Sequence, residues 1–120
     1  MSPLFELNGL KINYSPLLGT ISLSKSSEWI TISVLTFDIW MKIIEQNESN
    51  IEISVKENRM TVKIVKTTQN YIITLEQFKV ISCIFISSSD ARRLFFVSKD
   101  IKEEIHLMDF NREKMEMMKK

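Results

Sequence analysis

Polar and apolar residues alternate along six short stretches of the chain, and this period of two predicts β-strands. In each stretch the apolar side chains fall on one side and the polar ones on the other, the pattern of an antiparallel sheet with one buried face. The predicted strands are Leu10–Tyr14, Thr20–Ser24, Trp29–Val34, Ile51–Val55, Met60–Val65 and Asn70–Leu75.

The period changes after the third of these strands. Phe37, Trp40, Met41 and Ile44 follow the i, i+3, i+4, i+7 spacing of an amphipathic helix, and Thr36 is the expected N-cap. This segment therefore predicts a helix that packs its apolar stripe on the sheet.

The segment after the sixth strand has two interpretations. Thr74 followed by Gln77 fits a capping box, which predicts a second helix from Leu75 to about Ile86. The run "VISCIFI" within it is rich in β-branched residues, so a strand stays an open alternative. Further on, "RRLFFVS" reads as a last strand, and Ser98 is the expected cap of a C-terminal helix.

The chain also resembles itself. Residues 20–44 align without a gap on residues 61–85, and the identical pairs are Thr20/Thr61, Lys25/Lys66, Ile32/Ile73, Phe37/Phe78 and Ile43/Ile84. The repeat favours a helix in the second segment, because the first segment is helical. Two unrelated strand-and-helix segments could show the same similarity by chance.

These elements predict an α+β fold in a single domain spanning 1–120. Two pseudo-symmetric βββα units, about 10–48 and 51–87, form antiparallel sheet with the helices packed on one face. A last strand and a C-terminal helix follow at about 92–118.

Composition narrows the function classes. The 120 residues carry a net charge of +1, so no global basic field draws the protein to nucleic acid or to an anionic membrane. The single cysteine, Cys83, cannot form an internal disulfide and is expected to be a buried, inert thiol. We see neither a signal peptide nor a membrane span, which predicts a cytoplasmic or nuclear protein. The abundance of Ile, Lys, Ser and Asn is typical of AT-rich coding and suits a virus or a phage.

Strand alternation also defines the outer face of the predicted sheet. Ser, Thr and Asn dominate that face, and Lys11, Trp29, Lys56 and Lys63 lie on it. Lysine can meet phosphate, and any base can stack on an exposed ring. The plain alternative is a solvated sheet face, with Trp29 buried under the N-terminal segment around Phe5.

The stretch "YIITLEQFKVI", residues 71–81, resembles the strand-into-helix step of the Whirly proteins and the single-stranded-DNA-binding transcriptional coactivators. Those proteins open the helix with an acidic or amide residue and then an aromatic, here Glu76, Gln77 and Phe78. The resemblance covers about residues 20–86 and departs in having three strands per unit instead of four and no strongly basic region.

This resemblance implies sequence-independent binding of single strands along the sheet. The predicted nucleic-acid-binding residues are then Lys11, Lys25, Trp29, Lys56, Lys63 and Lys66. A second stretch, "WMKIIEQNESNIEISVKENRMTVKIV", is similar to the helix and strands of sliding-clamp domains, which implies a nucleic-acid-associated protein of another kind.

Catalytic chemistry is not indicated. His106, the only histidine, has Glu103 and Glu104 nearby but no metal-ligand spacing, and no glycine-rich phosphate loop is present. We expect no enzyme activity, cofactor or metal. A second hypothesis is a homodimer or a protein partner held through the Met-rich C-terminal helix, whose expected contact stripe is Ile101, Ile105, Met108 and Met115.

Overall fold

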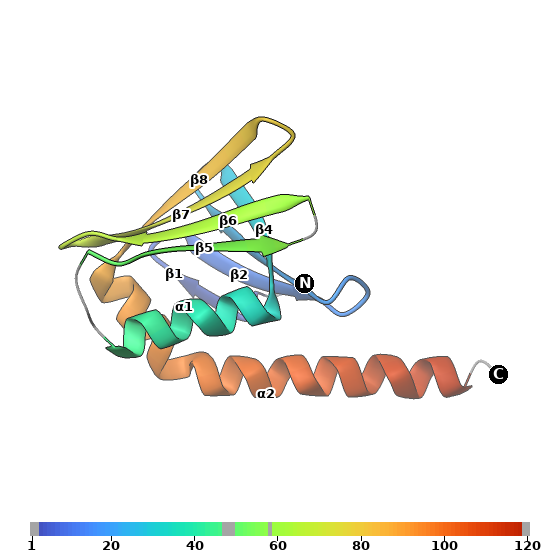
Figure 1. Ribbon diagram of the computed structural model, residues 1–120. Helices are drawn as coiled ribbons and strands as arrows, with labels where there is room; N and C mark the ends of the chain where they lie inside the picture. Colours follow the sequence, from blue (N-terminus) through green and yellow to red (C-terminus); the bar gives the residue numbers. More distant parts are fainter. Residues whose placement is uncertain (1–2, 47–49, 58, 119–120) are drawn as a thin grey trace.

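The chain folds into two consecutive units, each of four antiparallel strands followed by a helix (Figure 1). The computed structural model describes residues 3–46, 50–57 and 59–118. The first unit contains β1 (Phe5–Leu7), β2 (Leu10–Ser15), β3 (Thr20–Lys25), β4 (Glu28–Ser33) and α1 (Val34–Gln46). The second contains β5 (Glu52–Glu57), β6 (Met60–Lys66), β7 (Asn70–Gln77), β8 (Val80–Ser87) and α2 (Ser88–Met118).

Each unit forms its own sheet with the strands in chain order. We call β1–β4 the first sheet and β5–β8 the second sheet. The α+β class, the antiparallel sheets and the C-terminal helix are confirmed, whereas three strands per unit is wrong, since each unit has four. The predicted end of the first unit, residue 48, lies outside the described residues.

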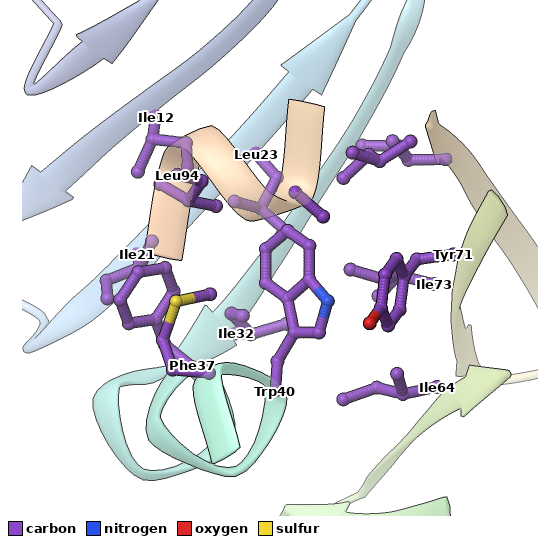
Figure 2. Packing of buried hydrophobic residues seen from close by; sticks show 14 of the residues in the cluster. Ile12, Ile21, Leu23, Ile32, Phe37, Trp40, Ile64, Tyr71, Ile73 and Leu94 are labelled. Carbon is purple, nitrogen blue, oxygen red and sulfur yellow. The ribbon is translucent and has the colours of Figure 1, made fainter. Parts of the chain in front are cut away.

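One hydrophobic core joins the two units. The inner faces of both sheets and the apolar sides of both helices contribute to it. Trp40 of α1 lies at the centre, fully buried, with Phe37 at 6.1 Å and Tyr71 of β7 at 6.3 Å between ring centroids (Figure 2). Edge-to-face aromatic contacts of this kind hold the first unit's helix against the second unit's sheet.

The first helix follows its predicted stripe. Phe37, Trp40, Met41 and Ile44 are all buried. The predicted cap is wrong by one turn, because Ser33 Oγ accepts a hydrogen bond of 3.0 Å from the Thr36 amide and α1 begins at Val34. Ser33 is therefore the N-cap, and Thr36 is the N3 residue.

Of the two interpretations of the segment after the sixth strand, the helix from Leu75 to Ile86 is wrong and the strand in "VISCIFI" is confirmed. Residues there continue β7 and form β8, and the two strands join through a turn at Phe78 and Lys79. Both turn residues have positive φ, 51° and 67°, a conformation that tight hairpins need and that Gly or Asn usually supplies. The Thr74–Gln77 capping box is thus a coincidence inside a strand.

The segment predicted as a last strand, "RRLFFVS", belongs to α2. That helix begins at Ser88, and Ser87 Oγ caps it by accepting a 3.1 Å bond from the Asp90 amide. Ser98 is not a cap; it lies inside the helix and its hydroxyl donates to the Phe95 carbonyl at 2.7 Å. The helix interior is preferred because Ala91, Leu94, Ile101 and Ile105 line up toward the core.

The architecture repeats, but in a different register from the sequence alignment. That alignment placed β3 on β6, β4 on β7 and α1 on β8. In the structure β2 corresponds to β6 and β3 to β7, and α1 corresponds to α2. The serine caps correspond as well, Ser33 before α1 and Ser87 before α2.

Helix α2 runs below the sheets in Figure 1 and is tied to the first unit by hydrogen bonds. Asn8 Nδ2 donates to Asp90 Oδ1 at 2.9 Å, and the Tyr14 hydroxyl donates to Asp109 Oδ1 at 2.7 Å. Lys102 forms an ion pair of 2.9 Å with Asp38 of α1. No helix in the described ranges is long and apolar enough to cross a membrane.

The buried Tyr14 predicts an alkaline loss of stability. Burial, and then the bond to Asp109, raises the pKa of Tyr14 from 10.0 to about 12. The unfolded chain loses this proton first, so the free energy of unfolding should fall as the pH rises from about 10 to about 12, by roughly 2 kcal/mol. Denaturant titrations of the wild type and of Tyr14→Phe measure this. The wild-type curve should fall more steeply, and parallel curves would contradict the assignment.

Candidate nucleic-acid interface

The outer face of the first sheet is a polar surface with one large exposed ring. We call it the Trp29 face; it consists of Lys11, Asn13, Ser22, Ser24, Trp29 and Thr31. Trp29 is 61% exposed, so the alternative of a tryptophan covered by the N-terminal segment is wrong. Exposed tryptophan on a polar face is unusual and often marks a contact surface.

Register places Lys11 and Trp29 in one row. Lys11 pairs with Ser24, and Ser24 pairs with Trp29. Adjacent strands lie about 4.8 Å apart, so the backbones of Lys11 and Trp29 are about 10 Å apart on the same face. This separation suits a lysine that meets a phosphate while the neighbouring ring stacks on a base.

One acid interrupts the Trp29 face. Glu6 of β1, a strand not predicted from the sequence, pairs directly with Lys11 and is exposed. No ion pair joins the two side chains in the described part of the chain. The Trp29 face is consequently polar with a single lysine, and stacking on Trp29 is its most distinctive contact.

The other outer-face lysines lie on the second sheet. Lys63 forms an ion pair of 2.8 Å with Glu52, and Lys56 is exposed at the end of β5. Both sheets turn their inner faces to the common core, so their outer faces are separate surfaces. The structure thus does not place Lys63 beside Trp29.

Two predicted lysines do not lie on the outer faces. Lys66 is only 6% exposed and follows Val62 and Ile64 on the inner side of β6, with its ammonium 5.6 Å from the centre of the Tyr71 ring. The Lys25 ammonium donates to the Phe85 carbonyl of β8 at 3.0 Å and links the two sheets. We therefore remove Lys66 and Lys25 from the candidate surface.

Sequence reasoning missed the outer face of β8. Phe85 is 58% exposed and Ile81 is 63% exposed, on a segment for which both a helix and a strand were open interpretations. Phe85 and Glu28 line one shallow hollow of about 180 Å³ where the β3–β4 turn meets β8. β4, which carries Trp29, packs along β8, so both exposed rings belong to the strands that border the junction of the two sheets. The alternation in "VISCIFIS" was the signal for this face.

Most of the stripe predicted to contact a protein partner is buried in the hydrophobic core of the chain itself. Ile101 and Ile105 are 3% and 4% exposed in the core, and Met108 packs partly buried against it. Of the four, Met115 alone is exposed, at 61%. A partner surface through Ile101 and Ile105 is therefore wrong.

Cys83 and His106 lie on separate elements. Cys83 is half-buried on the outer face of β8, where its sulfur accepts a 3.8 Å hydrogen bond from Thr74, so it is not the fully buried thiol that we expected. His106 is exposed on α2. The described residues contain no group of three or more His, Cys, Asp or Glu side chains that could hold a metal ion.

Comparison with protein-family models, curated proteins and solved structures gives no match to this chain.

Proposed function

We propose that this protein binds single-stranded nucleic acid without sequence preference, through the Trp29 face and the exposed ring of Phe85. The observation that carries the proposal is the exposure of Trp29, at 61%, in one cross-strand row with Lys11. Stacking of a base on an aromatic ring contributes roughly 1–3 kcal/mol, and every base offers a face for it.

Two further features support the proposal. Each unit has four strands followed by a helix, which is the strand number of the Whirly and coactivator units, although residues 71–81, which carried the resemblance, form a β-hairpin and not a strand-into-helix step. The polar residues around Trp29 are Ser, Thr and Asn, which can hydrogen-bond sugar and phosphate without reading base edges. With Lys11 as the one lysine of the Trp29 face, stacking rather than charge should supply most of the affinity.

The two tryptophans make a direct test possible. Trp40 is fully buried and Trp29 is exposed, so added oligo-dT should quench Trp29 emission and protect it from a soluble quencher. Replacing Trp29 with alanine should weaken binding about tenfold or more, because a stacking contact is lost. Anisotropy of labelled oligo-dT at low salt measures both variants.

The matched control is Phe96→Ala, which removes a ring that is 74% exposed and belongs to α2 and to neither sheet. This variant should bind as the wild type does. Equal weakening by both substitutions, or no binding of wild-type protein at micromolar oligo-dT, would refute the proposal. Affinity should also fall as salt rises, through counterion release at the phosphates.

A further inference from the structure

A small pocket lies at the beginning of α2, away from the Trp29 face. Its volume is about 190 Å³, and its walls are Ile44 of α1, Tyr71 of β7, and Ser88, Ser89 and Arg92 of α2. Drug-sized ligands occupy pockets of about 300 Å³ and more, so this one suits a smaller ligand. The polar residues of its lining indicate which kind of small ligand it suits.

Tyr71 supplies a buried hydroxyl. The residue is 2% exposed, and its hydroxyl has no hydrogen-bond partner among the described residues. Burial raises the pKa of Tyr71 above its ordinary value of 10.0, and the nearby positive charge of Arg92 acts against that rise. The hydroxyl therefore stays protonated at neutral pH and can donate into the pocket.

One more donor of the pocket lining, and one behind Tyr71, lack hydrogen-bond partners. Ser88 Oγ is buried without a hydrogen bond, and so is Nε1 of the fully buried Trp40. Figure 2 shows the indole nitrogen on the side of Trp40 that faces Tyr71. Buried polar groups are nearly always paired, so the unpaired Ser88 hydroxyl beside the Tyr71 hydroxyl in the pocket lining indicates a ligand that accepts hydrogen bonds.

The charges near the pocket favour an anion. The N-terminus of the 31-residue α2 carries a partial positive charge, and Arg92 follows one turn later, exposed and without an ion pair in the described part of the chain. The acid in this turn, Asp90, accepts the Asn8 amide at 2.9 Å, which holds its carboxylate on the β1–β2 side.

We propose that this pocket binds a phosphate group, held by the Arg92 guanidinium, the Tyr71 and Ser88 hydroxyls and the N-terminal turn of α2. Planar guanidinium and helix N-termini are the groups that proteins use for phosphate oxygens. A free phosphate ion and the terminal phosphate of a nucleic-acid strand share this chemistry. The pocket does not depend on the Trp29 face, so the two proposals can fail separately.

Inorganic phosphate is the first probe, added at constant ionic strength in exchange for chloride. Calorimetry should detect one site per chain, and in isotope-labelled protein the indole N–H resonance of Trp40 should shift while that of Trp29 does not. Arg92→Gln should weaken phosphate binding about tenfold or more, because a charged hydrogen bond is lost, and Tyr71→Phe by about threefold.

The matched control is Arg93→Gln, which removes the neighbouring exposed arginine that does not line the pocket. It should leave phosphate binding unchanged. Absence of binding at millimolar phosphate, or equal weakening by the Arg92 and Arg93 substitutions, would overturn the proposal. Circular dichroism verifies that each variant is folded.

A second arm identifies the source of the phosphate. Oligo-dT with a 5′-phosphate and with a 5′-hydroxyl is compared on the wild type and on Arg92→Gln. If the 5′-phosphate increases the affinity of the wild type but not that of Arg92→Gln, the pocket binds the ends of strands. Equal binding of both oligonucleotides, together with phosphate binding that needs Arg92, assigns it to the free ion.

Discussion

Replacing Trp40 with alanine should lower the free energy of unfolding by about 3–5 kcal/mol. The side chain is fully buried and contacts Phe37 on its own helix and Tyr71 on the second sheet. Its removal leaves a cavity between α1 and both sheets, and the surrounding strands cannot close it without breaking their pairing. Urea denaturation followed by circular dichroism measures the loss, since the main buried fluorophore is removed.

Leu35→Ala is the control for this prediction. Leu35 lies on the same helix and is 67% exposed, so its truncation should change stability by no more than about 0.5 kcal/mol. Trp40→Phe, which keeps an aromatic ring, should fall between the two. A loss below about 1 kcal/mol for Trp40→Ala would contradict the central position of this residue in the core.

The second large effect is expected at Glu57, at the end of β5. Its carboxylate accepts hydrogen bonds from the Ser33 and Thr36 hydroxyls and, at 3.3 Å, from the Ser33 amide. Thr36 is fully buried, so Glu57→Ala leaves its hydroxyl without this acceptor at the positive end of α1. The free energy of unfolding should fall by about 2–4 kcal/mol, because hydrogen bonds to a charged carboxylate are lost at a site shielded from solvent.

Glu52→Ala provides the comparison on the same strand. Glu52 pairs with Lys63 at 2.8 Å, but both side chains are about half exposed or more, at 60% and 46%. Exposed ion pairs contribute about 0–1 kcal/mol, so this substitution should have a small effect in the same denaturant titration. If both substitutions lowered the free energy of unfolding equally, the Glu57 carboxylate would not stabilise the N-terminus of α1.

Much of the fold was predictable from local pattern. Strand alternation identified six strands, and the stripe of α1 gave four buried residues. Failure came where the turn chemistry was unusual. The Asn8–Gly9 turn, with both φ angles positive, was a hairpin signal that would have identified β1. The Phe78–Lys79 turn carries no such signal. The misaligned repeat paired this segment with α1 and therefore favoured a helix where the structure has β8.

The candidate interface was predictable to a similar extent. Trp29, Lys11, Lys56 and Lys63 were assigned to outer faces by strand parity, and the structure places them there. Lys66 has the opposite parity: it continues the buried series of Val62 and Ile64, so strand alternation places it on the inner face. The pocket at α2 was beyond sequence reasoning, since it joins residues of β7 and α2 with α1 through tertiary packing alone.

The hydrogen bonds between the two units have a consequence for the order of folding. Asn8 reaches Asp90, Tyr14 reaches Asp109, and Lys25 reaches the Phe85 carbonyl, so three strands or turns of the first unit find partners only in the second. During synthesis the first unit is made before these partners. It is also made before Glu57, whose carboxylate accepts hydrogen bonds at the N-terminus of α1. We therefore expect that neither unit folds stably when it is separated from the other, and that the whole chain unfolds in one cooperative transition.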